Sequence, residues 1–318
     1  MWLTLTLFVI GFVFLIKGAD LLVTGSSSIA KRLRITDIAI GLTVVAFGTS
    51  APEFVVNVMA SLSGSNDIAI GNIVGSNISN ILLVLGLAAI IRPLRVKEHT
   101  TWKEMPFSLL TVILLAVIAN DIIIDSGSFS VITRIDGIVL LIFFLIYLYY
   151  TFGVSKIKGV EHEHIERYSL ALSLTMILLG LLGLTLGGRW MVDGAVLIAS
   201  SLGLSQAFIG LTIIAVGTSL PELATTLIAA RRGSVDIAVG AIIGSNIFNI
   251  LFVLGVSSTL SPLSFSAALN IDILIVVLVT LLLFSFMFIG QKHVLDRWQG
   301  VGFVSIYAVY ILYLIVRG

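Results

Sequence analysis

Residues 41–54 read GLTVVAFGTSAPEF and residues 210–223 read GLTIIAVGTSLPEL, with nine of the fourteen positions identical at an offset of 169. Each stretch places a proline followed by a glutamate, Glu53 or Glu222, in the middle of an apolar segment long enough to cross a bilayer. A charged carboxylate at the bilayer centre costs about 2.5–3.5 kcal/mol on insertion scales. Because the chain bears this cost twice and in register, we interpret the two stretches as the halves of one ion-binding site.

The composition is that of a polytopic membrane protein. The 318 residues are 58% hydrophobic and 11% charged, with a mean hydropathy of +1.15, whereas soluble domains carry about 25% charged residues. Cysteine is absent and the four histidines lie in or beside polar breaks, which leaves oxygen ligands that suit Ca²⁺ and Na⁺. No cofactor motif and no basic tract for nucleic acid is present, so the expected partners are these two ions and the lipid bilayer.

Spanning helices need roughly 20 apolar residues, and this length predicts an all-α protein with ten transmembrane helices. The predicted spans are 2–29, 36–62, 67–91, 104–119, 132–152, 169–201, 206–231, 236–260, 267–289 and 298–316. With the N-terminus outside, the loops after odd-numbered spans hold fourteen of the eighteen basic residues. Basic residues concentrate in cytoplasmic loops, so we expect both termini to be extracellular and the location to be the cell membrane.

The repeat extends beyond the opening motif. Residues 67–86 match residues 236–255 at fifteen of twenty positions, again at an offset of 169. This predicts an N-terminal repeat of five helices at 1–152, a cytoplasmic linker loop at 153–168 and a C-terminal repeat of five helices at 169–318. Because five is odd, equivalent helices cross in opposite directions, and such inverted-topology repeats place a binding site near the midplane with alternating access.

Spacing adds hydroxyl and amide groups to the two carboxylates. The prolines before Glu53 and Glu222 break the helix and free carbonyl oxygens. Hydroxyls three and four residues earlier are expected to share the helix face of each glutamate: Thr49 and Ser50, Thr218 and Ser219. A serine and an asparagine one turn apart repeat in the third and eighth spans: Ser76 and Asn80, Ser245 and Asn249. These are ligand candidates or interhelical hydrogen-bonding groups.

Several other polar residues are expected to serve structure. Asn77 and Asn246 point away from the ligand face and are assigned to packing or support. The glycine pairs Gly71/Gly75 and Gly240/Gly244 allow close helix approach, and Asp67 and Asp236 are predicted N-caps. Two opposite-charge pairs are predicted to neutralise each other: Lys17 with Asp20, and Arg189 with Asp193.

At these residues the chain resembles the cation/calcium exchanger superfamily, in particular its prokaryotic sodium/calcium exchangers. The resemblance rests on G-T-S-A-P-E with G-S-N-I-S-N, and on G-T-S-L-P-E with G-S-N-I-F-N. It implies a core of the second, third, seventh and eighth helices, across which the long first and sixth helices slide. It also implies a protein that functions as a monomer and has no enzymatic activity.

The resemblance also implies individual roles for the candidate ligands. Glu53 and Glu222 would be carboxylates shared by Ca²⁺ and Na⁺, with Asn80 and Asn249 at the centre. The Ca²⁺ site would take backbone carbonyls of Thr49 and Thr218. The Na⁺ sites would be completed by the following carbonyls and hydroxyls: Ala46, Ala215, Ser50, Ser219, Ser76 and Ser245.

The leading hypothesis is therefore sodium/calcium antiport. Potassium coupling is disfavoured because the potassium-dependent branch carries aspartate where Asn249 stands, and proton coupling because Gly71–Gly75 and Gly240–Gly244 hold no acidic residue. A cation channel would use the same glutamates as a selectivity ring. An intramembrane enzyme would need a nucleophile, or a base beside a metal. This chain has no cysteine or histidine within the predicted spans.

Overall fold

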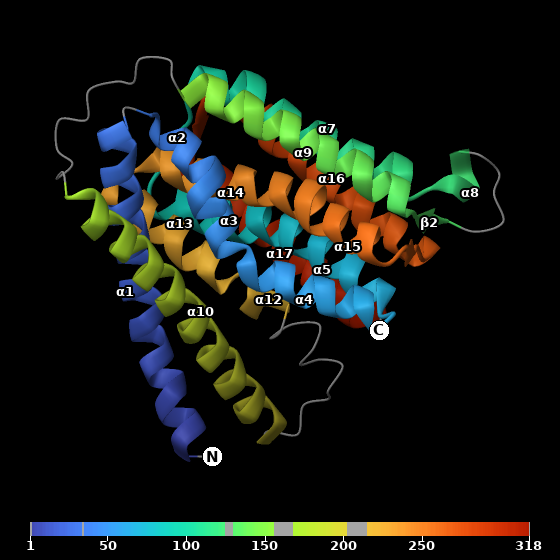
Figure 1. Cartoon of the computed structure of the whole chain (residues 1–318), viewed down its shortest axis with the longest axis horizontal. Helices are drawn as coiled ribbons and strands as arrows, with labels where there is room; N and C mark the ends of the chain where they lie inside the picture. Colours follow the sequence, from blue (N-terminus) through green and yellow to red (C-terminus); the bar gives the residue numbers. More distant parts are fainter. Residues whose placement is uncertain (1, 34, 125–129, 156–167, 202–214, 318) are drawn as a thin grey trace.

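The computed structural model (Figure 1) is a bundle of helices, and it describes residues 2–33, 35–124, 130–155, 168–201 and 215–317. The first part of the predicted span 206–231 and most of the predicted linker 153–168 lie outside these residues. Elements of the first half are α1 (Trp2–Leu33), α2 (Asp37–Ile40), η1 (Gly41–Val45), α3 (Ala46–Thr49), α4 (Ala51–Leu62), α5 (Asn66–Ser79), η2 (Asn80–Leu85), α6 (Gly86–Ile91), β1 (Leu94–Arg95), η3 (Thr100–Glu104), α7 (Met105–Ile118), α8 (Asp121–Ile124), β2 (Val131–Ile132) and α9 (Arg134–Ser155).

The second half repeats much of this order. Its elements are α10 (Leu170–Ser201), α12 (Ala215–Thr218), α13 (Leu220–Arg232), α14 (Val235–Phe248), η5 (Asn249–Leu254), α15 (Gly255–Leu260), β3 (Leu263–Ser264), η6 (Ala267–Leu269), α16 (Asn270–Phe286), β4 (Val294–Leu295) and α17 (Arg297–Arg317). Within the described residues, eight helices and one bent helix pair are long and apolar enough to cross a membrane. Together they overlap nine of the ten predicted spans; the tenth, 206–231, is described from Ala215 onward.

Two helical segments form the centre of the bundle. In the most apolar window of the span Asn66–Ile91, 78% of the residues are buried, and in that of Val235–Leu260, 94% are buried. The corresponding share is 28–39% in the other unbroken spans. Lipid-facing helices of a bundle keep a large exposed apolar surface, so these low values fit a peripheral position. The two central spans carry the repeated G-S-N motifs, and their burial brings those motifs to the middle of the molecule.

The second span is broken at the Pro-Glu motif. Asp37–Thr49 and Ala51–Leu62 meet at an angle of 50° around Ser50, whose backbone (φ −85°, ψ 9°) leaves the helical region. Ser219 has nearly the same backbone angles (φ −86°, ψ 7°) at the equivalent point before α13. Proline is favoured at the first positions of a helix because its missing N–H is not needed there. Each proline therefore starts a new helix, and each glutamate lies in its first turn.

Turns of π-helix lie beside the first of these breaks and at the repeated asparagines. One π-helical segment, η1, precedes α3, and two others, η2 and η5, begin at Asn80 and Asn249. Such turns are rare and occur frequently at functional sites. The apolar pattern does not predict them, because a shift of one residue in the hydrogen-bond ladder leaves that pattern nearly unchanged.

Helices α1 and α10 lie side by side and extend away from the other helices (Figure 1). Three glycines spaced seven residues apart on α1 form the contact: Gly11, Gly18 and Gly25. A Cβ at any of them would lie 2.7 or 2.8 Å from a backbone oxygen of α10. Backbones this close leave no room for side chains, so the two helices meet along a smooth seam.

The predicted close approach at Gly240 and Gly244 is confirmed. A Cβ at Gly240 would lie 2.9 Å from the carbonyl oxygen of Ile38, and one at Gly244 would lie 2.6 Å from that of Leu42. Helix α14 therefore packs directly on the backbone of α2 and η1. By the offset of 169, the partners expected for Gly71 and Gly75 are residues 207–211. These lie outside the described residues, so close approach at Gly71 and Gly75 stays a prediction.

Two short antiparallel strand pairs, β1 with β4 and β2 with β3, connect the loops. The first pair joins the loops after the third and ninth spans, and the second joins the loops after the fourth and eighth. Strands of two residues carry no periodic signal, so the sequence did not predict them. Each pair therefore joins two odd-numbered loops or two even-numbered loops.

Candidate cation site

Glu53 and Glu222 lie in the protein interior, each 1% exposed. Both lie in the first turn of a helix, α4 or α13, where the positive end of the helix dipole stabilises a carboxylate. The two carboxylates are close enough to interact electrostatically. The Thr218 hydroxyl group contacts the carboxylate of Glu53. One oxygen of each, Oε2, has no hydrogen-bond partner in the described part of the chain.

The hydroxyl of Ser50 contacts the carboxylate of the opposite repeat. Ser50 Oγ donates a hydrogen bond to Glu222 Oε1 at 2.9 Å. The placement of Ser50 on the helix face of Glu53 stays a prediction, because this bond describes only the contact of its hydroxyl with the carboxylate of the other repeat. The equivalent hydroxyl, Ser219 Oγ, is buried and has no hydrogen-bond partner among the described residues.

Thr49 and Ala46 lie at the end of α3, beside the break. The Thr49 hydroxyl donates to the backbone oxygens of Val45 (3.1 Å) and Ala46 (3.3 Å), within its own helix. Ser245 Oγ of α14 also reaches the Ala46 oxygen, at 3.4 Å. The Ala46 oxygen also accepts the backbone N–H of Ser50 at 3.0 Å, so hydrogen bonds from α3, the break and α14 meet at this one carbonyl. Ala215 begins α12 at the edge of the described residues.

The repeated asparagines meet where α5 and α14 end. Asn80 and Asn249 are each 1% exposed, and Ser76 is 4% exposed. Each ligand candidate donates its amide N–H to an asparagine of the other repeat: Asn80 Nδ2 to Asn246 Oδ1, and Asn249 Nδ2 to Asn77 Oδ1, both at 3.0 Å. Their own Oδ1 atoms are buried and without hydrogen-bond partners in the residues that the structure describes.

Buried oxygens without partners therefore gather on four different helices. Side-chain atoms of this kind among the predicted ligands are Glu53 Oε2, Glu222 Oε2, Asn80 Oδ1, Asn249 Oδ1 and Ser219 Oγ. Buried polar atoms normally have hydrogen-bond partners, and each exception needs an explanation. Carboxylate, amide and hydroxyl oxygens are the ligands of hard cations, so this set is chemically suited to Ca²⁺ or Na⁺.

Two of the predicted structural roles are wrong and one is confirmed. Asp20 pairs with Arg232 at the end of α13 rather than with Lys17, because α1 crosses α13 where a basic side chain compensates the helix carbonyls. Asp67 and Asp236 lie in the first turns of α5 and α14, but the N-caps are serines two residues earlier. The Arg189–Asp193 ion pair is present at 3.9 Å.

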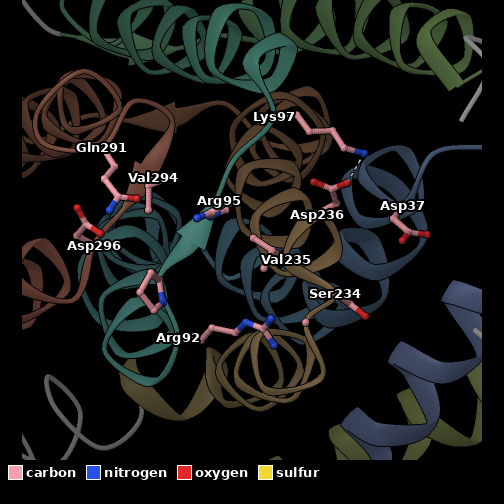
Figure 2. Close-up of a pocket in the computed structure, with 12 residues that line it drawn as sticks. Asp37, Arg92, Arg95, Lys97, Ser234, Val235, Asp236, Gln291, Val294 and Asp296 are labelled. Carbon is pink, nitrogen blue, oxygen red and sulfur yellow. Dashed lines mark ion pairs between the residues drawn. The ribbon is translucent and has the colours of Figure 1, made fainter. Parts of the chain in front are cut away.

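A cavity of about 680 Å³ opens where the odd-numbered loops meet (Figure 2). It is lined by Asp37, Arg92, Pro93, Arg95, Lys97, Gly233, Ser234, Val235, Asp236, Gln291, Val294 and Asp296. Lys97 forms an ion pair with Asp236 at 2.5 Å, drawn as a dashed line in Figure 2. The lining holds three basic and three acidic side chains, so it is balanced in charge and selects no ion by sign.

The repeat counterparts of the basic residues in this cavity lie in an even-numbered loop and are not basic. A smaller cavity of about 470 Å³ lies between Gly64–Ile68 and Ser264–Ser266. Arg92, Arg95 and Lys97 correspond there to serines at 261, 264 and 266. The three basic residues of the larger cavity therefore have no basic counterpart at the smaller one.

The fold and the site motifs match a known protein family. The family model described as "Sodium/calcium exchanger protein" matches residues 3–153 and 172–316, which is most of the chain. The chain belongs to the sodium/calcium exchanger family. The chain is therefore a multi-pass membrane protein of a transporter family.

Similar proteins cover nearly the full length of this exchanger. A solved structure of the sodium-calcium exchanger NCX_Mj soaked with 10 mM Na⁺ and zero Ca²⁺ has a TM-score of 0.85 and 38% identity, covering 98% of both chains. Sodium/calcium exchanger MaX1 of Methanosarcina acetivorans is 31% identical and covers 96% of both chains. Inner membrane protein YrbG of Escherichia coli is 38% identical and covers 89% of both.

Proposed function

We propose that the protein exchanges Na⁺ for Ca²⁺ across the membrane at one site near the bilayer midplane. The observation that carries this proposal is the pair of buried carboxylates, Glu53 and Glu222, each with an oxygen that has no hydrogen-bond partner in the described residues. Two negative charges inside a membrane protein require compensating cations. One Ca²⁺ provides two positive charges, and Na⁺ ions bound in its place provide the same compensation.

The ligand set follows the motif positions. Ca²⁺ takes both glutamates with the carbonyls of Thr49 and Thr218, and Asn80 and Asn249 face the centre of the site. Na⁺ takes the glutamates together with oxygens from Ala46, Ala215, Ser50, Ser219, Ser76 and Ser245. The hydrogen bonds among Ser50, Ser245 and their partners keep these oxygens together in the absence of a cation.

The chain crosses the membrane ten times in two inverted repeats, at 1–152 and 169–318, joined by the cytoplasmic linker 153–168. The loop contacts support this topology, because β1–β4, the Lys97–Asp236 ion pair and the larger cavity all join odd-numbered loops to one another or to adjoining helix ends. β2–β3 and the smaller cavity join even-numbered loops. The basic residues then place both termini outside a cell membrane, and the monomer contains the complete site.

Alternating access arises from movement of α1 and α10 across the core. Among the residues that the structure describes, the α1–α10 pair packs asymmetrically, because α1 lies along α13 whereas α10 makes no comparably extensive contact with α4. Repeat symmetry would place α10 along α4. An asymmetric position of one helix pair on a symmetric core supports two alternative positions, and the glycine seam keeps α1 and α10 together as they move.

Calcium flux into proteoliposomes tests the proposal. The purified protein is reconstituted, and uptake of radioactive calcium is followed under an imposed Na⁺, K⁺ or H⁺ gradient of equal size. We expect uptake to follow the Na⁺ gradient alone. Uptake that follows K⁺ or H⁺ would assign a different coupling ion, and uptake without any counter-ion would indicate a channel.

A further inference from the structure

We propose that Asn77 and Asn246 are positioning residues that fix the direction of the amide groups of Asn249 and Asn80. The inference rests on the proposed function, in which the side-chain oxygens of those two asparagines bind the cation. It concerns a pair of residues outside the ligand set. Each acts on the ligand asparagine of the opposite repeat, and not on the one in its own helix.

Four hydrogen bonds define the arrangement. Asn77 Nδ2 donates to the backbone oxygen of Asn246 at 3.1 Å, and Asn246 Nδ2 donates to the backbone oxygen of Asn77 at 3.5 Å. The side-chain oxygens of the same two residues accept the N–H groups of Asn249 and Asn80, both at 3.0 Å. All four residues are at most 2% exposed, so water does not compete for these groups.

The backbone oxygens decide which way each amide points. A carbonyl oxygen accepts hydrogen bonds and never donates, so only the NH₂ group of Asn77 can face the backbone oxygen of Asn246. This leaves Asn77 Oδ1 directed at the third partner, Asn249. Only an NH₂ group satisfies that oxygen, so Asn249 turns its nitrogen toward Asn77 and its oxygen away. The same argument applies to the other repeat. The backbone oxygen of Asn77 fixes the NH₂ group of Asn246, and Asn246 Oδ1 then fixes the NH₂ group of Asn80.

The consequence is that both ligand oxygens are presented to the cation without a competing donor. An asparagine amide has nearly the same shape after a half-turn about its last bond, so packing alone distinguishes its two ends poorly. A half-turn of Asn249 would place its NH₂ group, which repels a cation, where its Oδ1 stands. Outer groups that orient metal ligands typically change metal affinity about 10- to 100-fold when removed.

Double-mutant cycles on Ca²⁺ binding test the inference. Equilibrium binding of radioactive calcium to the purified full-length protein is measured for Asn77→Leu, Asn249→Ala, Asn80→Ala and the two double variants that contain Asn77→Leu. We expect Asn77→Leu to weaken Ca²⁺ binding about 10-fold. The effect of Asn77→Leu should largely vanish in the Asn249→Ala background, and should persist within about 2-fold in the Asn80→Ala background.

The reciprocal arm and a matched control complete the design. Asn246→Leu should couple to Asn80→Ala and not to Asn249→Ala. Asn57 is a buried asparagine whose Nδ2 also reaches the opposite repeat, at Ser257 Oγ (2.9 Å). Asn57→Leu removes such a contact away from the ligand asparagines, and it should add independently to both alanine variants.

The outcomes separate the inference from the proposed function. If the alanine variants at 80 and 249 bind Ca²⁺ like the unmodified protein, these asparagines are not ligands, and both the inference and that part of the proposed function fall. If the alanine variants bind weakly but Asn77→Leu couples equally to both, the role of Asn77 is general packing and only the inference falls. Where Asn77→Leu does not fold, Asn77→Ala and the Asn246 arm provide the same comparison.

Discussion

Ser50 of the first repeat donates a hydrogen bond of 2.9 Å to the carboxylate of Glu222 in the second repeat, 172 positions away in the chain. The bond exists because α3 ends at Ser50 and the side chain turns toward the facing helix break. The carboxylate of one repeat is thus held by the hydroxyl of the other, and the site forms only when the two repeats pack together.

Neutralising either buried carboxylate should abolish exchange. Glu53→Gln or Glu222→Gln keeps the shape of the side chain and removes one of the two negative charges that balance the transported cations. We expect sodium-dependent calcium flux to fall to the level of protein-free vesicles, while the variant elutes at the same volume as the unmodified protein in size-exclusion chromatography. The matched control is Glu98→Gln at an exposed glutamate, which should keep normal flux. Normal exchange in a folded Glu53→Gln variant would contradict the ligand assignment.

The two equivalent serines should differ in their effect on stability. Ser50→Ala removes a hydrogen bond to a carboxylate and should lower the free energy of unfolding by about 2 kcal/mol in the cation-free protein. Ser219→Ala removes a buried hydroxyl that has no hydrogen-bond partner in the described residues, so the free energy of unfolding should stay unchanged or rise. Thermal unfolding in sodium- and calcium-free buffer measures both. A lower melting temperature for Ser219→Ala than for Ser50→Ala would be inconsistent with this geometry.

A side chain on the glycine seam should separate α1 from α10. A Cβ at Gly18 would lie 2.8 Å from both the Gly180 oxygen and the Leu184 nitrogen, which are backbone atoms that cannot rotate away. Gly18→Ala should therefore cost about 1–3 kcal/mol and reduce the calcium transport rate. Gly302→Ala is the matched control, because no atom lies within 4 Å of its Cβ position in the described structure. Equal transport rates in the two variants would show that calcium transport does not depend on the close packing of α1 against α10.

Single cysteines should report opposite membrane faces at equivalent repeat positions. The chain has no native cysteine, and Arg95 and Ser264 are exposed residues related by the offset of 169. In right-side-out vesicles, a membrane-impermeant thiol reagent should label Ser264→Cys, and should label Arg95→Cys only after the membrane is permeabilised. Labelling of both from the same side would rule out the inverted topology.

Much of the fold was predictable because the signals are local or periodic. Apolar runs of spanning length predicted segments that overlap nine helical spans in the described residues. The small residues Gly240 and Gly244 predicted close packing of α14, which the backbone of Ile38 and Leu42 confirms. The duplicated Pro-Glu motif identified two carboxylates that prove to be buried together. Each of these depends on residues near one another in the chain or on a constant offset.

The remaining features depend on contacts between distant residues. Sequence spacing paired Lys17 with Asp20, because spacing rules consider no neighbouring helix. The structure instead joins Asp20 to Arg232. It also joins Ser50 to Glu222 across the two repeats, a contact that spacing within one helix does not predict.

The sequence by itself determined the membrane class, the repeat and the residue types of the site, since hydropathy and duplication are properties of the chain alone. Only the tertiary structure decided the direction of the groups at the site. The sequence assigned Asn77 and Asn246 to packing or support, because their spacing turns them away from Asn80 and Asn249 on their own helices. Packing of α5 against α14 brings each to the asparagine of the other repeat, and hydrogen-bond direction is fixed by such contacts between distant parts of the chain.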